Sequence, residues 1–563
     1  MNSSNINRRQ FLNRAGLAGL GILALGGGAW SCEREEEKGA IPGKLLGPDF
    51  GSGHRLRMAM GELNERRIIR KEVVIIGGGV AGLACAWRLR KMGIHDFTIL
   101  EMEYEPGGNA RGGITDTNHW GLGRGKSADG KQAGQRYPWG AHYLPVPDAR
   151  NTLLIEFLQS AGVVTGFDLL NRPVFNELYL CQAPEERLMI HGQWQKGLVP
   201  QLGVPAKERA QIAEFFQVME DWKKRVGVDG KPAFAIPAEN SSQDPEFLHL
   251  DTMTMAEYLH MLRLDSPHLR WYVDYCCRDD FGLGVEQCSA WAGVHYFASR
   301  TGGGANAESS EVLTWPEGNA WLVQQLSKDL DPWQLQRNSM AYSVKNMEDY
   351  VEVKAIDPTV PFDAMVLQAK AAVFAGPQFV AAHIVEGHPG MHPAFTYAPW
   401  IVANVRLRFK DNPLLHDVHW DNVPYGRKSL GYVHAGHQSL AMQQPEETVL
   451  TWYMPLSDGD PKAARKQALD QRYAHWQAMV MEDLEYMHPG LVQHVRNIDV
   501  WTWGHGMIRP LPGLITGEAL RAARQPIGRI HFAHSDLSGM SIFEEAFHQG
   551  CRAAAEVAVE LRG

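Results

Sequence analysis

The feature that most constrains this chain is a glycine-rich turn between a predicted strand and a predicted helix. Residues 72–76 form a β-branched apolar run that is typical of a buried parallel strand. The run leads into Gly77, Gly79 and Gly82, which have the GxGxxG spacing, and then into residues 83–90 with helical periodicity. The three glycines permit a tight turn, close approach of a pyrophosphate and close packing of the helix on the strand. The pattern predicts a Rossmann-like dinucleotide-binding domain.

A second predicted strand ends in an acidic residue at the distance expected for ribose recognition. Residues 97–100 form the apolar run, and Glu101 follows 19 residues after Gly82. An acid at this point accepts hydrogen bonds from both ribose hydroxyls and repels a 2′-phosphate, while the pyrophosphate lies at the helix N-terminus. Together with the glycine turn, this acid predicts an adenine dinucleotide as the ligand.

The segment after Glu101 resembles the flavin-containing amine oxidase superfamily. It contains the doublet Gly107-Gly108, then Asn109 and the basic residue Arg111. The resemblance implies FAD as the cofactor. The backbone of the doublet and Asn109 would lie against it, and the Arg111 guanidinium would be a countercharge to the pyrophosphate.

Two further segments have counterparts in the family. Residues 135–145 resemble the loop that lies along the isoalloxazine, which makes Gly140, Ala141 and His142 contact candidates. Ala341, by its position in a predicted strand pair, is expected to offer backbone contacts to the adenine.

The C-terminal residues complete the same implied site. Residues 528–533 form a predicted buried strand, and Asp536 matches the family acid near the FAD phosphates and ribityl chain. Residues 541–555 read as a helix whose first turn, here including Phe543, points its N–H groups at the flavin C2 carbonyl in the family. Such a helix end stabilises negative charge on the reduced flavin.

The expected fold is α/β, with a Rossmann-like FAD-binding domain assembled from both chain ends and an inserted α+β substrate domain. The FAD-binding parts are predicted at residues 71–150, 311–380 and 501–563, and the substrate parts at residues 151–310 and 381–500.

The first 70 residues are expected to be an export signal followed by a linker. Residues 1–31 carry the pair Arg8-Arg9, no acid and a soft apolar stretch, which resembles a twin-arginine export signal. We therefore expect the twin-arginine export machinery as a partner and an exported, periplasmic location. Cys32 follows at a lipoprotein-type cleavage position, but the preceding Ala-Trp-Ser departs from a lipobox, so a lipid anchor there stays open. Residues 32–70 are the predicted linker and N-terminal extension.

Composition excludes several classes of function. The formal charge is −9, and removal of the three leader arginines would bring it to −12, which argues against a nucleic-acid partner. Hydrophobic residues make up 44% and charged residues 21% of the chain, which is enough for a large core. Because no CxxC or HExxH motif occurs in the sequence, we expect no bound metal.

The resemblance places two histidines nearest the flavin, and both are candidates for the catalytic base. His142 lies in the isoalloxazine loop, and His505 lies between two glycines that would leave its imidazole accessible. We expect His505→Ala to keep FAD and to lower the rate of flavin reduction about 10²-fold. Asp279 and Asp280, in contrast, are expected to mark a turn rather than a catalytic pair.

The chain departs from the well-known amine oxidases at three family positions. No lysine lies within residues 401–405, where the family holds a water near flavin N5. Ile542 replaces one caging aromatic residue, and the other maps near Gly506. Residues 532–536, together with His505 and Gly506, resemble bacterial spermidine-dehydrogenase-like proteins more than the monoamine oxidases.

The resemblance implies an exported FAD-dependent oxidoreductase that oxidises an amine or polyamine by hydride transfer to flavin N5. A second interpretation keeps the fold and gives a desaturase or isomerase of an apolar, isoprenoid-like substrate. A third is a flavin-binding accessory protein without turnover. The sequence names neither the small-molecule substrate nor the electron acceptor.

Overall fold

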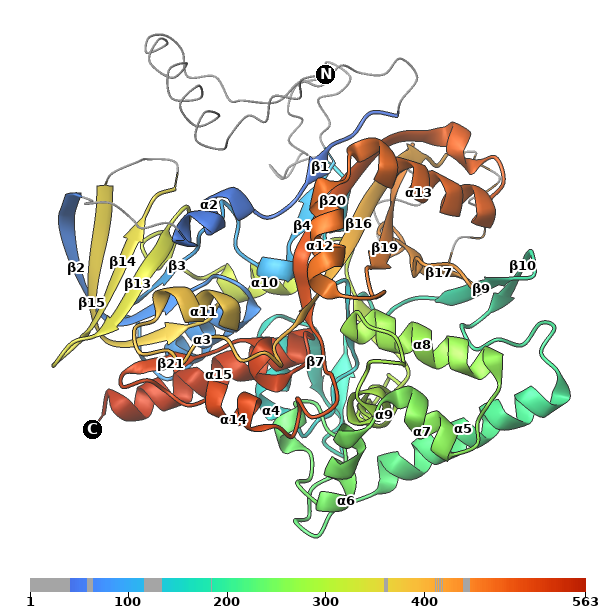
Figure 1. The fold of residues 1–563 in the computed structure, drawn as a ribbon, viewed down its shortest axis with the longest axis horizontal. Helices are drawn as coiled ribbons and strands as arrows, with labels where there is room; N and C mark the ends of the chain where they lie inside the picture. Colours follow the sequence, from blue (N-terminus) through green and yellow to red (C-terminus); the bar gives the residue numbers. More distant parts are fainter. Residues whose placement is uncertain are drawn as a thin grey trace, which may run out of the picture. The chain divides into compact units, whose positions relative to one another are not determined.

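The computed structural model describes residues 41–57, 64–115, 134–183, 185–358, 363–410, 412, 414, 417, 419–438 and 446–562. Residues 41–563 form one compact unit that contains two large sheets (Figure 1). The predicted export signal and Cys32 lie outside the described residues. No helix in the described part of the chain is long and apolar enough to cross a bilayer.

The smaller sheet joins strands from distant parts of the chain. Its parallel strands are β12 (Leu335–Gln336), β3 (Phe97–Leu100), β2 (Asn64–Ile76), β15 (Asp363–Phe374) and β21 (Ile530–Phe532). Two antiparallel strands, β14 (Val351–Ile356) and β13 (Met340–Asn346), extend it beyond β15. The β-branched residues 73–76 are buried, as expected for a strand covered on both faces. The predicted α/β fold with a Rossmann-like domain is confirmed.

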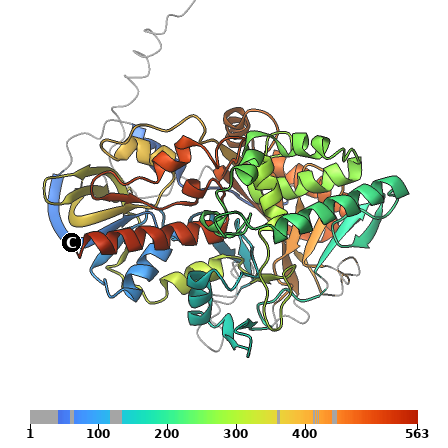
Figure 2. The same ribbon diagram turned by 90° about the horizontal axis from the view of Figure 1, so that it is seen from below.

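Two helices from opposite ends of the chain pack together on this sheet. They are α3 (Val80–Lys91), which follows the glycine turn, and α15 (Phe543–Glu560), seen beside the sheet in Figure 2. A Cβ on Gly550 would lie 2.1 Å from the Ala81 carbonyl oxygen, so this close approach requires glycine. The two chain ends therefore form one domain.

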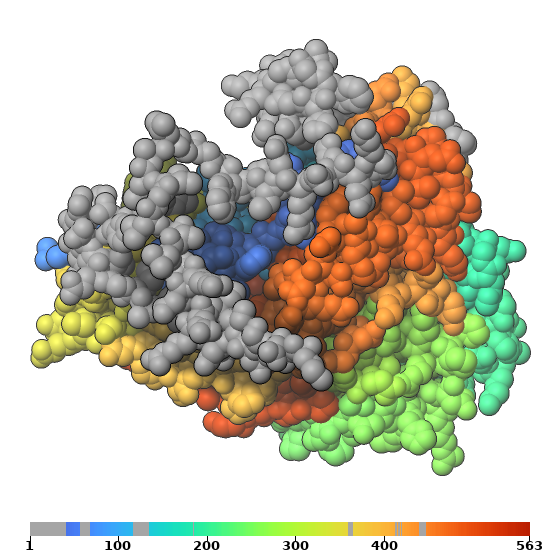
Figure 3. Space-filling view, turned by 45° about the horizontal axis from the view of Figure 1, so that its top comes forward, coloured from blue at the N-terminus to red at the C-terminus, as the bar shows by residue number. Residues whose placement is uncertain are grey.

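The larger sheet has eight strands in the order β1-β20-β16-β19-β18-β17-β9-β10. Their bounds are β1 (Leu45–Leu46), β20 (Val495–Ile508), β16 (Tyr397–Arg408), β19 (Glu447–Pro455), β18 (Gly431–His434), β17 (Asp421–Pro424), β9 (Glu186–Ile190) and β10 (Gln193–Lys196). Figure 3 shows the first described residues, in blue, beside the orange C-terminal segments. There β1 pairs in parallel with Val500 and Trp501 of β20.

Two cores cover the two faces of the larger sheet. One contains α5 (Ala206–Lys224), α7 (Met255–Met261), α8 (Pro267–Phe281) and α9 (Ala290–Ala298), and the other contains α12 (Pro461–Asp470) and α13 (Tyr473–Met487). Side chains alternate along β16, so that Trp400 and Val402 face the first core whereas Ile401 and Ala403 face the second. The first core carries one wall of the cavity described below.

Packing divides the chain at other points than the sequence boundaries. Residues 501–508 pair in the larger sheet as part of β20, so the boundary predicted at residue 501 falls inside a strand. Helix α4 (Thr152–Ser160), predicted in the substrate domain, shares a core with α3 and α15. The predicted linker, residues 32–70, contributes β1 and the first half of β2.

The shorter elements complete the described chain. They are α2 (Phe50–His54), β4 (Gly112–Ile114), β5 (Arg136–Pro138), β6 (Tyr143–Pro145), β7 (Val164–Phe167), β8 (Pro173–Phe175), α6 (Pro245–Leu248), β11 (Val312–Thr314), α10 (Ala320–Ser327), α11 (Gln378–Ile384) and α14 (Glu518–Ala523).

Candidate active site

The glycine turn lies at the carboxyl end of β2, and its three glycines have different surroundings. Gly77 has a φ of +106°, a backbone conformation that favours glycine. A Cβ on Gly82 would lie 1.9 Å from the Gly77 carbonyl oxygen, so helix α3 packs directly on the turn. Nothing lies within 4 Å of a Cβ built on Gly79, which is the N-cap of α3. The open space is thus at the helix N-terminus, where a pyrophosphate would be held.

The acid and the second glycine pair lie against this turn. Glu101 ends β3, and its Oε2 accepts a hydrogen bond from the Gly78 N–H at 2.8 Å. Burial raises the pKa of this carboxyl, while hydrogen bonds from backbone N–H groups oppose the rise. The Gly107 N–H donates to the Gly78 carbonyl at 2.8 Å, and a Cβ on Gly108 would meet Gly79 Cα at 3.5 Å. The structure brings these sequence-predicted residues together.

Asp536 and Gln378 add polar groups at the end of β15. Asp536 accepts hydrogen bonds from the Tyr397 hydroxyl at 2.6 Å and from the Gln378 N–H at 3.0 Å. Burial alone would raise the pKa of Asp536, but His534 at 3.1 Å and these hydrogen bonds hold it below its ordinary value. Gln378 Nε2 is buried and has no partner among the described residues. A ligand oxygen would satisfy this donor.

The residues present therefore fit an adenine dinucleotide. Gly79, Gly107 and Gly108 would admit the pyrophosphate, Glu101 would accept from the ribose, and Gln378 would donate to an oxygen of the phosphates or ribityl chain.

Arg111 and Ala341 have surroundings that the sequence did not predict. The Arg111 guanidinium lies 3.3 Å from Glu103 Oε2 and over the Trp501 and Trp503 rings, at 5.1 and 5.5 Å from their centroids. Its charge is therefore paired within the protein. Ala341 is buried in β13, where the register with β14 shifts.

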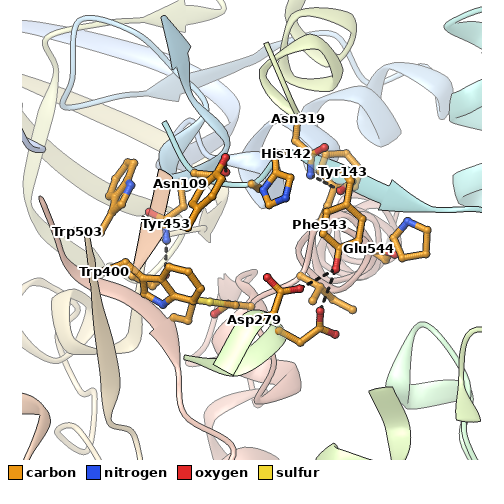
Figure 4. A pocket seen from close by; sticks show the side chains of 18 of the residues that line it. Asn109, His142, Tyr143, Asp279, Asn319, Trp400, Tyr453, Trp503, Phe543 and Glu544 are labelled. Carbon is orange, nitrogen blue, oxygen red and sulfur yellow. Dashed lines mark hydrogen bonds between the residues drawn. The ribbon is translucent and has the colours of Figure 1, made fainter. Parts of the chain in front are cut away.

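A cavity of about 900 Å³, including its open mouth, lies between the larger sheet and the start of helix α15 (Figure 4). Its walls come from the isoalloxazine loop, the β16, β19 and β20 strands, helix α8 and the start of α15. The lining residues are Asn109, Gly140, Ala141, His142, Tyr143, Pro145, Ile236, Asp279, Asp280, Arg300, Asn319, Trp400, Val402, Tyr453, Trp503, Gly506, Met507, Ser541, Ile542, Phe543 and Glu544. The predicted flavin contacts Asn109, Gly140, Ala141, His142 and Phe543 are all in this set. The lysine expected of the family has no counterpart, since Val402 is the residue of the segment 401–405 that lines the cavity.

Aromatic rings form much of the cavity wall. His142 stacks on Tyr453 with ring centroids 4.7 Å apart. Burial lowers the pKa of His142 to about 4, so its imidazole is neutral at pH 7. Trp400 Nε1 and Asn319 Oδ1 are buried on the wall without partners among the described residues, so a ligand can hydrogen-bond to both.

A group of charged and hydroxyl side chains occupies the opposite wall. One Arg300 guanidinium nitrogen donates to both carboxylate oxygens of Asp280, at 2.8 and 2.9 Å. The Tyr143 hydroxyl lies 3.3 Å from Asp279 Oδ2 and 3.2 Å from Asp280 Oδ1. Arg300 is thus paired with Asp280, and no cation in the described part of the chain forms a salt bridge with Asp279. Burial and the charge of Asp280 raise the pKa of Asp279 to about 7.

Asp279 and Asp280 are not in a turn, as the sequence suggested, but in the last turn of α8. This helix begins at the Ser266 cap and ends at Gly282, whose φ is +69°. Acids at a helix C-terminus are disfavoured by the helix dipole. Helix stability therefore does not explain their position. Two acids at the C-terminal end of a predicted helix are the sequence signal that could have identified them as site residues.

Glu544 is a second acid on the cavity wall, and its side chain is not among the site residues predicted from the sequence. It lies in the first turn of α15, where acids are common because the dipole favours them, so the sequence alone offers a purely structural reason for it. The residue is 4% exposed and lines the cavity. Burial raises the pKa of Glu544 to about 7.

The structure does not place His505 on the cavity. Its ring stacks on Phe379, with centroids 4.2 Å apart, and lies edge-on to Tyr397. The physical reason is a bulge in β20. Between the pairs Ala398–Met507 and Trp400–Trp503, β20 has more residues than β16, and such a bulge re-aims a side chain. His505 therefore lacks the accessible position on which its predicted role as base depended.

Known structures share this fold. Putrescine oxidase bound to putrescine has a TM-score of 0.60 at 15% identity, covering 87% of this chain and 100% of that chain. Cyclohexylamine oxidase from Brevibacterium oxydans has a TM-score of 0.60 at 14% identity, covering 88% and 100%. A fatty acid isomerase from P. acnes that produces CLA has a TM-score of 0.57 at 16% identity, covering 86% and 98%. A search of curated proteins by sequence found no significant match.

The sequence itself matches the family described as flavin containing amine oxidoreductase over residues 80–558, which is most of the chain. That range includes the cavity and all the cofactor-binding candidates except Gly77 and Gly79, which immediately precede it. The cofactor is therefore FAD, and the chain is an FAD-dependent oxidoreductase that belongs to the flavin-containing amine oxidoreductase family.

Proposed function

We propose that the chain oxidises the C–N bond of an amine or polyamine that binds as a cation in the cavity. The observation that carries the proposal is the charge balance of the wall. Its one arginine, Arg300, is already paired with Asp280, which leaves the Asp279 and Glu544 carboxyls facing the cavity. Neither carboxyl has a salt-bridge partner among the described residues, and above about pH 7, where both are ionised, they favour a cationic ligand. The aromatic rings of Trp400 and Tyr453 add cation–π stabilisation.

The same charge balance disfavours the apolar alternatives. A fatty acid would bring a carboxylate beside two acidic side chains, and its charge would find no free arginine. An isoprenoid would leave the buried carboxyls without a partner, at the cost of burying unpaired polar groups. Desaturation or isomerisation of an apolar substrate therefore fits this wall less well than amine oxidation.

The protein contributes binding, orientation and exclusion of water. FAD supplies the redox chemistry by accepting a hydride equivalent from the carbon next to nitrogen. Asp279 would hold an ammonium group of the ligand, while Tyr143 and Arg300 fix the position of Asp280. Trp400, Tyr453 and neutral His142 would pack on the alkyl part and restrict its motion. Such positioning is the main requirement of hydride transfer.

Anaerobic reduction of bound FAD by a panel of ligands tests the proposal. The panel consists of putrescine, spermidine and cyclohexylamine, with oleate and a carotenoid as apolar competitors. Spermidine is included because of the resemblance to spermidine-dehydrogenase-like proteins. We expect amines to bleach the flavin within seconds and the apolar ligands to leave it oxidised. Bleaching by oleate or the carotenoid alone would favour the apolar alternative, and no bleaching would favour an accessory protein.

We also propose that the protein is exported by the twin-arginine pathway. The support is the Arg8-Arg9 pair in an acid-free leader, together with an FAD-binding domain that uses both chain ends. FAD is assembled in the cytoplasm, so a holoprotein of this kind needs a pathway that carries folded chains. Whether Cys32 then receives a lipid stays open.

Replacing both Arg8 and Arg9 with Lys tests export. We expect uncleaved, FAD-loaded enzyme to stay in the cytoplasmic fraction, as measured by flavin content and mass. Arg14→Lys, which changes an arginine outside the pair, should leave export intact. Unchanged periplasmic flavoprotein from the double variant would contradict the proposal.

A further inference from the structure

Glu544 lines two cavities at once. Besides the active-site cavity, it lines a smaller one of about 280 Å³, open solvent at its mouth included, whose wall it shares with Arg300, Ile236 and Pro145. Its carboxyl therefore lies where the two spaces adjoin. This carboxylate accepts a hydrogen bond from the backbone N–H of Glu544 itself, and no other described residue donates to it.

The smaller cavity leads toward the protein surface. It is lined by residues 145–148, by Asn151 and Leu154 at the start of α4, and by Ser299, Arg300 and Gly302 after α9. Asp148 in this wall pairs with Arg150, whose side chain is 61% exposed. Two acidic residues, Glu544 and Asp148, thus line the smaller cavity, and the Asp148 side chain is itself 20% exposed.

The charged groups around Glu544 form hydrogen bonds with other residues. Arg300 donates to both oxygens of Asp280, and Asp279 accepts from Tyr143. Glu545, the next residue of α15, accepts from the Ala238 N–H at 2.6 Å. The remaining titratable groups that line the same spaces are neutral His142, the Tyr143 and Tyr453 hydroxyls, whose pKa values burial raises well above their ordinary value, and Asp148. Glu544 is the acid that is free to exchange a proton with a ligand.

We propose that Glu544 accepts the proton that a bound ammonium group must lose before oxidation, and releases it through the smaller cavity toward Asp148. This inference rests on the proposed amine oxidation. In the step, one N–H bond of the ammonium breaks and its electron pair stays on nitrogen, while an O–H bond forms at the Glu544 carboxylate. No electrons leave the substrate at this stage, and the product is the neutral amine.

Burial makes this proton transfer energetically accessible. The pKa of Glu544 is raised to about 7, and the same burial lowers the pKa of an ammonium group. The two values therefore move toward each other. Ammonium in water titrates near 10.4, far above an ordinary carboxyl at about 4.3, so transfer between solvated groups would be unfavourable.

Asp279 and Glu544 then have separable roles. Asp279, on α8, already accepts a hydrogen bond from the Tyr143 hydroxyl and does not line the smaller cavity. It would therefore bind the cation without providing a route by which the ammonium proton leaves. Removing Asp279 should weaken binding, whereas removing Glu544 should slow reduction and change its pH profile. A merely structural role for Glu544 predicts no change in that profile.

The test compares Glu544→Gln with wild-type holoenzyme in anaerobic reduction by putrescine and by cyclohexylamine. In the wild type the limiting rate should fall as the pH drops through about 7, because Glu544 becomes protonated. In Glu544→Gln we expect a rate at pH 8 that is lower by about 10²-fold and shows no inflection near 7, with little change in Kd. Glu545→Gln, one residue away and outside both cavities, should keep the inflection. Glu544→Asp should restore part of the rate and the inflection.

Infrared titration of the same proteins gives a readout without substrate. Because Asp279 titrates in the same range, the titration is done in the Asp279→Asn background. A protonated-carboxyl band that disappears between about pH 6 and 8 should be present in Asp279→Asn, lost when Glu544→Gln is added and kept when Glu545→Gln is added instead. If wild-type flavin is reduced by amines and Glu544→Gln keeps the rate and inflection, or if the band persists when Glu544→Gln is added to Asp279→Asn, the inference is overturned. If no amine reduces the wild type, the proposed function itself has failed.

Discussion

Gly79→Val is expected to give a folded protein that no longer binds FAD. Gly79 has φ −72° and ψ −178°, which valine adopts without strain, and no atom lies within 4 Å of its Cβ position. The apoprotein should therefore tolerate the new side chain. The valine would, however, fill the space at the N-terminus of α3 that the pyrophosphate requires. An overlap of this kind costs about 3 kcal/mol, equal to a loss of more than a hundredfold in affinity.

The measurement is the flavin absorbance per chain after gel filtration, with circular dichroism to show the fold. Gly166→Val in β7 is the matched control, because its Cβ position is also open and it lies outside the cofactor site. It should keep one FAD per chain. Full flavin occupancy in Gly79→Val would mean that the pyrophosphate lies elsewhere.

Asp279→Asn is expected to leave FAD bound and to weaken amine binding about 30-fold. A hydrogen bond to a charged partner contributes about 2 kcal/mol, and asparagine keeps the shape while removing the charge. Because burial raises the pKa of Asp279 to about 7, its carboxyl is neutral below that pH. Wild-type affinity for an amine should therefore fall as the pH drops from 8 to 6, and this dependence should be smaller in the variant.

The dependence of the flavin reduction rate on amine concentration gives the Kd for each pH. Asp274→Asn is the control, since Asp274 is also on α8 but accepts the Val285 N–H at 3.0 Å and does not line the cavity. It should bind amines like the wild type. Equal amine affinity in Asp279→Asn and wild type would exclude Asp279 as the ammonium partner.

The cofactor site could be predicted because its determinants are local. Gly77, Gly79 and Gly82 lie where a strand, a turn and a helix follow one another in sequence. Glu101 ends the next strand. Each residue therefore has a position fixed by its neighbours along the chain. The C-terminal helix α15 needed the resemblance, because its contact with α3 joins residues more than 450 positions apart.

The substrate wall could not be predicted because tertiary packing assembles it. Asp279, Tyr143 and Arg300 come from α8, β6 and the segment after α9, and no local spacing links them. The position of His505 away from the cavity has a related cause. Its flanking glycines indicated accessibility, but the direction of its side chain depends on a bulge relative to β16, which the sequence of β20 alone does not reveal.

The central claim, amine oxidation at this cavity, is tested most directly by a single anaerobic turnover with product analysis. Wild-type holoenzyme is mixed with the amine that bleaches its flavin fastest, and the carbonyl product is counted against the FAD reduced. We expect one carbonyl compound for each FAD reduced, with the nitrogen released as ammonia or a shorter amine. Flavin reduction without a carbonyl product, or reduction by apolar ligands alone, would contradict it.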